Sequence, residues 1–215
     1  EMSPENREQM TVLLNSVWGT IVSDIAKSRK LTVAQLDAIA NTLGARTPEL
    51  ALANKLVDKV AYEDEYHNMI RAKLKVDKKE KYNIVSITDY AKKAASTVED
   101  YSKDDIIAVI YAQGEIAGGE GDVNVIGEGS IKRSLEEARK DDDVKAIVLR
   151  VNSPGGSALT SELIWREIEI TKKVKPVVVS MGNYAASGGY YIAANADRIF
   201  AEPNTITGSI GVFGM

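Results

Sequence analysis

Three short β-branched runs in the second half of the chain place the strongest constraint on its fold. They lie at Ile106–Tyr111, Ala146–Val151 and Val177–Met181, and two helical patterns, Gly129–Lys140 and Leu159–Lys173, separate them. Strand and helix therefore alternate along the chain. The runs are apolar without a two-residue alternation, which is typical of parallel strands buried on both faces. The sequence predicts an α/β unit with parallel strands and covering helices.

Residues 1–75 have apolar residues at helical spacing together with helix start signals. The stripe from Met10 to Ile25 follows a Ser-Pro start and predicts a long amphipathic helix that ends near Ser28. Three shorter helices are expected after it, with starts at Thr32, at Thr47-Pro48 and at Tyr62.

The stretch between these two parts is polar and charged. It carries the charged run at 75–81, one short predicted strand at Tyr82–Ile87, and a turn-rich segment at 94–105. The predicted organisation is therefore a helical part at 1–75, a linker with a short strand at 76–104, and an α/β unit at 105–215.

Composition narrows the classes of function. The chain has 215 residues, a net charge of -4, one histidine and no cysteine. It shows no basic run interleaved with aromatics, so nucleic acid is not an expected partner. Thiolate chemistry is excluded, and neither a metal nor a cofactor is expected. His67 lies among acidic residues of a predicted helix and is expected to be a solvated surface side chain. We expect the chain to be an internal piece of a longer protein.

Two glycine pairs come directly after predicted strands, in "NSPGGS" at 152–157 and "ASGGYY" at 186–191. Ser187 has only small neighbours, and a helix that begins after it would place free amides beside its hydroxyl. Such a serine could attack a carbonyl while N–H groups of Gly188 and of Gly155 or Gly156 bind the oxyanion. The alternative interpretation is an ordinary turn and close helix packing, with the Ser187 hydroxyl bonded to backbone.

The partner of this serine decides the mechanism. A Ser-His-Asp triad would need His67, which lies far upstream in a solvent-suited context. A lysine whose pKa is lowered by burial could accept the proton instead. The lysines of the α/β part lie in charged or polar runs, so we expect this base to lie outside the chain.

The segments "VKAIVLRVNSPGGS" and "KPVVVSMGNYAASGGYYIAANADRIFAEPNTITGSIGVFG" closely resemble the signal peptide peptidase A (protease IV) family. These are Ser-Lys peptidases with the Clp-protease/crotonase-like spiral fold, and the resemblance runs from Asp105 to Met215. Residues 1–75 resemble the helical end of the preceding repeat in the long, two-repeat form. The resemblance implies that Ser187 is the nucleophile, that Gly156 and Gly188 donate to the oxyanion, and that Ser209 orients a lysine of the preceding repeat.

The resemblance also implies an activity and a location. It implies a serine endopeptidase that degrades released signal peptides and other short apolar peptides. It further implies homo-oligomers, attachment to the bacterial cytoplasmic membrane through a segment outside this chain, and a catalytic domain on the extracytoplasmic side. Two alternatives use the same fold: a crotonase-type acyl-CoA enzyme that stabilises an enolate with paired N–H groups, and a non-catalytic assembly module.

Overall fold

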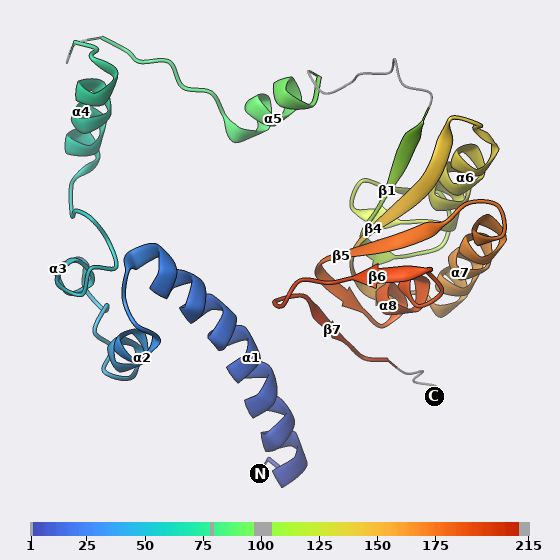
Figure 1. Ribbon diagram of the computed structural model, residues 1–215, viewed down its shortest axis with the longest axis horizontal. Helices are drawn as coiled ribbons and strands as arrows, with labels where there is room; N and C mark the ends of the chain where they lie inside the picture. The colour runs from blue at the N-terminus through green and yellow to red at the C-terminus, as the bar shows by residue number, and fades with distance from the viewer. Residues whose placement is uncertain (1, 78–79, 97–104, 211–215) are drawn as a thin grey trace. The chain divides into compact units, whose positions relative to one another are not determined.

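Figure 1 shows the computed structural model, which describes residues 2–77, 80–96 and 105–210. The chain divides into two compact units, Glu1–Asp100 and Tyr101–Met215. Helices make up the described part of the first unit, and the second contains a sheet with helices. This confirms the predicted α/β class, with helices before it. The assignment of the helical part to the end of a preceding repeat stays a prediction.

The helices of the first unit begin where the sequence supplies a cap. The hydroxyls of Ser3, Thr32 and Thr47 each accept an N–H from the first turn, and proline follows two of these three residues. Within this unit α1 packs against α2, where Val22 and Leu36 are buried. The helices are α1 (Pro4–Arg29), α2 (Val33–Asn41), α3 (Pro48–Ala53), α4 (Glu63–Leu74) and α5 (Ile87–Ser96).

The predicted strand at Tyr82–Ile87 is wrong. Residues 81–86 have no regular secondary structure, and Ile87 begins α5. A strand is stabilised by its neighbours, and the side chains of Ile84 and Val85 are 78% and 62% exposed. Helix α5 was not predicted, although it has a start signal: the Ser86 hydroxyl accepts the N–H of Asp89. Most of the turn-rich segment predicted at 94–105 lies outside the described residues.

The second unit is built on a sheet whose strands pair in the order β2-β3-β1-β4-β5-β6, with β7 paired to β5. All pairs are parallel except β2 with β3. The strands are β1 (Ile106–Ile116), β2 (Gly121–Asp122), β3 (Val125–Ile126), β4 (Val144–Gly156), β5 (Val177–Ala186), β6 (Arg198–Phe200) and β7 (Ile206–Gly208). The helices are α6 (Glu128–Lys140), α7 (Ala158–Lys172) and α8 (Gly188–Ala193).

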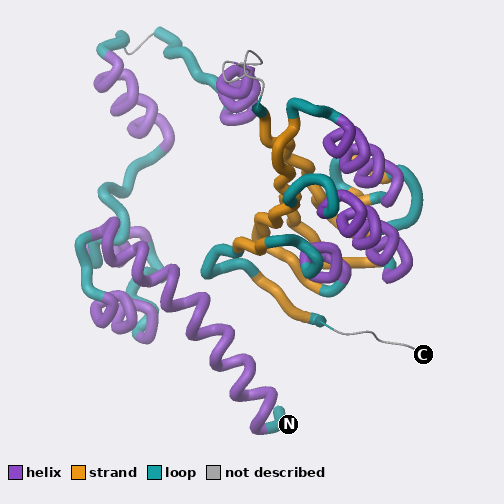
Figure 2. The backbone as a smooth tube through the Cα atoms, turned by 45° about the vertical axis from the view of Figure 1, so that its right-hand side comes forward, coloured by secondary structure: helices purple, strands orange, loops and turns teal. Residues whose placement is uncertain are grey.

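Helices α6, α7 and α8 lie on one side of this sheet in both views (Figures 1 and 2). Burial along β4 accordingly alternates, and Ile147, Leu149 and Val151 point into the core with no exposed surface. The expectation of burial on both faces is wrong for the described residues, because Ile107 and Tyr111 of β1 are 64% and 71% exposed. An apolar run shows which residues favour burial, but it does not show which face of the sheet other elements cover.

The parallel pairing brings two chain turns together. Ser153 at the end of β4 pairs with Ala185 at the end of β5. The carboxyl ends of adjacent parallel strands share one edge of the sheet, which is where sites assemble in α/β folds. The two glycine-containing turns predicted to carry the chemistry therefore lie side by side.

Candidate active site

Ser187 lies on a sharp turn between β5 and α8. Its backbone has φ 49° and ψ -122°, a conformation that residues with a side chain rarely adopt. Two backbone hydrogen bonds hold the turn: the Ser187 N–H donates to the Gly208 carbonyl, and the Tyr191 N–H donates to the Ser187 carbonyl, both at 2.9 Å. The hydroxyl makes no capping hydrogen bond to α8. The turn thus presents a half-buried serine whose position the backbone fixes.

The glycines of the β4 turn fit against this serine with no room for a side chain. A Cβ on Gly155 would lie 2.7 Å from both the Gly188 nitrogen and the Ser187 Cβ. A Cβ on Gly156 would lie 2.1 Å from the Ile116 carbonyl oxygen. Both glycines also have positive φ, at 103° and 151°. Glycine is therefore required at positions 155 and 156 by close approach as well as by backbone conformation.

Two of the three predicted oxyanion donors border the site. The Gly156 nitrogen lies 3.3 Å from the position of a Cβ on Gly188, so these two residues are neighbours. The Gly155 N–H, in contrast, donates to the Ser153 hydroxyl at 3.1 Å in the protein interior. Gly156 and Gly188 are thus better placed than Gly155 to donate to an oxyanion beside Ser187.

A hollow of about 580 Å³ opens beside the serine, a size typical of ligand pockets. Ser187, Ser209, Gly156 and Gly188 all line it, so the structure brings together four of the five residues predicted for the site. Ser209 itself has a positive φ of 47° and an exposed side chain. Its role in orienting a lysine stays a prediction.

The sequence predicts a general base outside the chain, and this stays a prediction. None of the described residues that line the hollow is a lysine or a histidine. Within the same unit, Lys172 Nζ donates to the Asn195 carbonyl and Lys175 Nζ to the Ala138 carbonyl, at 2.5 and 2.8 Å. Among the described residues, no group of histidine, cysteine and acidic side chains could hold a metal ion.

His67 belongs to the first unit and is more enclosed than expected. Its side chain is 34% exposed, and its Nδ1 lies in hydrogen-bond contact with the Tyr82 hydroxyl. Its Nε2 lies 3.5 Å from Glu63 Oε1. His67 is therefore a surface side chain as expected, but it is partly covered by Tyr82, a contact that the sequence did not predict.

One pair of residues at the hollow was not predicted from the sequence. Tyr191 on α8 lines the hollow, and its hydroxyl donates a hydrogen bond to the Glu162 carboxylate on α7. This bond raises the pKa of the Tyr191 phenol above its ordinary value. The "GGYY" sequence carried a signal, since a tyrosine one helical turn after Ser187 must lie near it.

The chain has a serine on a strained strand-to-helix turn, beside glycine amides at the carboxyl edge of a parallel sheet. This arrangement is typical of the class of α/β proteins that use a nucleophilic serine. The model of peptidase family S49 matches residues 1–77 and 169–215. The chain belongs to peptidase family S49.

Individual relatives agree with the family match. Protease 4 of Haemophilus influenzae is 36% identical over the whole chain, which covers 36% of that relative. The chloroplastic serine protease SPPA of Arabidopsis thaliana is 34% identical over 98% of the chain and 32% of its own length. Among solved structures, a ClpP1 mutant of Listeria monocytogenes shares a TM-score of 0.36 and 18% identity over 55% of each chain. The chain thus spans about a third of the length of these relatives.

Proposed function

We propose that this chain supplies the nucleophile and the oxyanion donors of a serine endopeptidase that cleaves short apolar peptides, including released signal peptides. The observation that carries the proposal is the strained turn at Ser187, which faces a hollow bordered by Gly156 and Gly188. A strained backbone conformation at a single serine whose hydroxyl makes no capping hydrogen bond is typical of a functional position.

The proposed reaction has two steps. The Ser187 oxygen bonds to the substrate carbonyl carbon and passes its proton to a neutral lysine from outside this chain, while the N–H groups of Gly156 and Gly188 bind the oxyanion. The C–N bond then breaks, and the leaving amine takes the proton from the lysine. Water adds to the acyl-enzyme in the second step, releases the carboxylic acid and restores the Ser187 hydroxyl.

The lining of the hollow supports apolar substrates. Ala158 at the start of α7, Ala194 at the end of α8, and Ile210 contribute apolar surface next to Ser187. Apolar walls with a few placed polar groups are typical of binding pockets that recognise an apolar group.

The remaining parts of the proposal rest on the family resemblance. We propose a Ser-Lys dyad in which Ser209 orients the lysine, and homo-oligomers in which the complete protein is active. We also propose attachment to the bacterial cytoplasmic membrane through another segment, with the peptidase on the extracytoplasmic side. Among the described residues, no helix is both long and apolar enough to cross a membrane.

A fluorophosphonate probe tests the nucleophile directly. In the full-length protein, we expect the probe to label Ser187 and block peptide cleavage, and Ser187→Ala to abolish both. Ser134→Ala serves as the matched control, since it removes a half-buried hydroxyl from α6, outside the hollow. Labelling that persists in Ser187→Ala would overturn the proposal, as would cleavage that persists in that variant.

A further inference from the structure

The face of the sheet that helices α6, α7 and α8 leave open carries an arginine between aromatic rings (Figures 1 and 2). Arg150 of β4 pairs with Tyr111 of β1 and with Ser180 of β5, and Ser180 pairs with Phe200 of β6. Paired residues of neighbouring strands point to the same face, so these four side chains form one row across the sheet. The two aromatic residues at its ends are 71% and 55% exposed.

The adjacent row on this face is mainly apolar. Val109, Val148 and Val178 pair across β1, β4 and β5, and Arg198 of β6 ends the row. Val109 is 50% exposed, and Ile107, two residues before it on β1, is 64% exposed. A connected apolar surface of this kind is typical of a face that another part of a protein covers.

Arg150 has more hydrogen-bond donors than partners. It is half-buried, and its Nη1 donates to the Ser180 hydroxyl and to the Met181 carbonyl, both at 2.8 Å. Among the described residues, nothing accepts a hydrogen bond from its Nε or Nη2, and no carboxylate forms an ion pair with Arg150 or Arg198. A guanidinium binds a carboxylate through two parallel N–H groups. The Nε and Nη2 groups of Arg150 therefore remain available for one.

The charge of Arg150 restricts what can cover this face. An apolar cover without an anion would bury an unpaired charge, which is strongly unfavourable, whereas a carboxylate would satisfy the free donors. We propose that the open face of the sheet is the docking surface for another segment of the same full-length polypeptide, one that places an acidic side chain, flanked by apolar residues, on Arg150. This inference does not depend on the proposed peptidase function.

Two observations favour the same polypeptide as the source of this segment. The chain spans about a third of the length of its relatives, so most of a full-length protein of that size lies outside these 215 residues. A segment tethered to the sheet also has a high effective concentration, so one ion pair and a modest apolar contact are enough to hold it in place.

Photo-crosslinking identifies the segment in the full-length protein. The photoreactive residue p-benzoylphenylalanine replaces Tyr111, which it resembles in shape, and the crosslinked peptides are identified by mass spectrometry after digestion. We expect a crosslink to a peptide from outside these 215 residues that contains Asp or Glu, with the mass of the polypeptide unchanged on a denaturing gel. Irradiation of the protein unfolded in urea is the control and should give no such crosslink.

The other outcomes of this experiment contradict the proposal. A crosslinked product of doubled mass would show that a second copy covers the face. A crosslinked peptide without an acidic residue would overturn the carboxylate. Absence of any crosslink in the folded protein would show that the face stays open.

A double-mutant cycle then tests the ion pair itself. Arg150→Met, and neutralisation of the acidic residue in the crosslinked peptide to its amide, should each raise the equilibrium constant for unfolding by about tenfold or more. The two changes together should raise it no further than the larger single effect, because both break one interaction. If Arg150→Met does not fold, Arg150→Lys provides the second cycle, since it keeps the charge and loses the paired N–H geometry.

Arg166→Met is the matched control for this cycle. Arg166 lies on α7, its side chain is 56% exposed, and it pairs with Glu169 at 3.1 Å. Its loss should change the unfolding constant little, because solvent screens the pair. Multiplicative effects of Arg150→Met and of the acidic substitution would show that the two side chains do not interact, and would overturn the proposed pairing.

Discussion

The backbone at Ser187 holds a conformation that costs free energy in any residue with a side chain. Its φ of 49° combined with ψ of -122° lies outside the regions allowed to L-residues, and such positions cost about 1–3 kcal/mol each. The hydrogen bond between the Ser187 N–H and the Gly208 carbonyl helps to hold the turn in place. This free-energy cost arises from the backbone conformation and does not depend on the hydroxyl.

Because the strain does not depend on the hydroxyl, two substitutions at position 187 should differ in stability. Ser187→Ala keeps the strain, whereas Ser187→Gly relieves it, and the entropy of glycine in the unfolded chain offsets part of the gain. We expect Ser187→Gly to be more stable than Ser187→Ala by about 1 kcal/mol, measured by urea denaturation. Both variants lack the hydroxyl, so the comparison isolates the backbone. Equal stabilities would contradict the assignment of strain to this residue.

The two kinds of site residue differ in how far the sequence could predict them. Ser187 and the glycines lie in short motifs that follow strands. Their proximity could be predicted, because the carboxyl ends of adjacent parallel strands share one edge of a sheet. Glu162 and Tyr191 are 29 residues apart, on separate helices. Their contact depends on how α7 packs against α8, which no local pattern in the sequence records.

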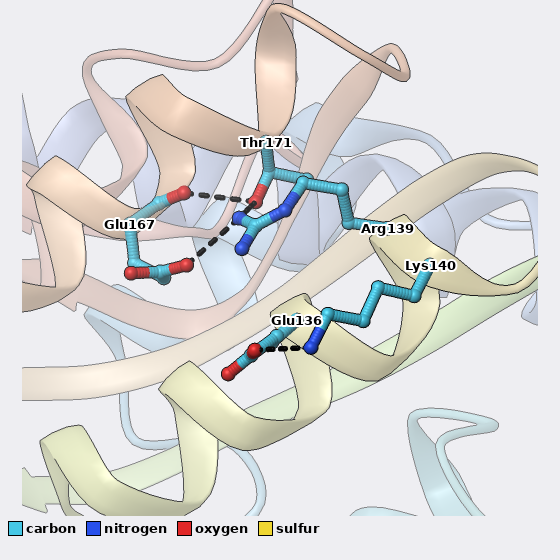
Figure 3. A network of polar contacts seen from close by, with 5 residues as sticks. All are labelled: Glu136, Arg139, Lys140, Glu167 and Thr171. Atoms are coloured by element: carbon cyan, nitrogen blue, oxygen red, sulfur yellow. Dashed lines mark hydrogen bonds and ion pairs between the residues drawn. The ribbon is translucent and has the colours of Figure 1, made fainter.

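Helices α6 and α7 are joined by a buried polar network (Figure 3). Arg139 Nη1 donates to Glu167 Oε1 at 2.8 Å and to the Thr171 hydroxyl at 3.0 Å. The Arg139 and Glu167 side chains are only 18% and 10% exposed. The same figure shows an exposed pair on α6, Glu136 with Lys140, which offers a matched comparison.

Removing the carboxylate of the buried pair should destabilise the protein much more than removing the exposed one. Loss of one partner leaves a charge buried, which costs about 3–5 kcal/mol when the partner has no replacement. Because Arg139 keeps its bond to Thr171, we expect Glu167→Ala to lower the free energy of unfolding by about 2–3 kcal/mol, measured by urea denaturation. We expect little measurable change for Glu136→Ala, since solvent screens that pair. A similar loss of unfolding free energy in the two variants would show that burial does not determine how much the Arg139–Glu167 pair stabilises the protein.

The start of α6 carries a carboxylate that responds to pH. The Gly119 N–H lies 3.0 Å from both oxygens of Glu128, and this hydrogen bond, followed by that from its own backbone N–H, holds the pKa of Glu128 below its ordinary value. A lowered folded-state pKa contributes stability that is fully present above the unfolded value, about pH 4.3. That contribution is lost as pH falls through the lower, folded-state pKa.

We therefore expect Glu128→Gln to be less stable than the unchanged protein at neutral pH, and the difference to disappear in strong acid. Urea midpoints of the two proteins across this pH range would measure it. The amide removes the titration while nearly preserving the shape of the side chain. A stability difference that does not vary with pH would show that the Glu128 charge has no part in holding the loop at Gly119.

The longer elements were largely predictable in both units, since the four helices predicted in residues 1–75 correspond to α1 to α4. Helices α6 and α7 and the starts of β1, β4 and β5 follow from apolar runs and their spacing. Short strands such as β2 and β6 carry too few residues for a periodic pattern. The strand expected at Tyr82–Ile87 failed because β propensity is realised only where another strand offers hydrogen bonds and contact.

At the scale of the whole molecule, the open face of the sheet differs from the covered one. Ile107, Val109 and Tyr111 alternate along β1, so they share one face, and they are 64%, 50% and 71% exposed. Adjacent large apolar side chains in water are typical of a surface that another part of a protein covers. Since the chain spans about a third of the length of its relatives, further residues of the full-length protein could supply that cover.

We expect Tyr111 to be protected in the full-length protein. Hydroxyl-radical footprinting should modify Tyr111 several-fold more slowly there than in the 215-residue chain, because burial blocks access of the radical to the ring. Both proteins unfolded in urea provide the control, since Tyr111 should then react at the same rate in each. Equal rates in the two folded proteins would show that this face stays open to solvent, and the apolar residues of β1 would then need another explanation.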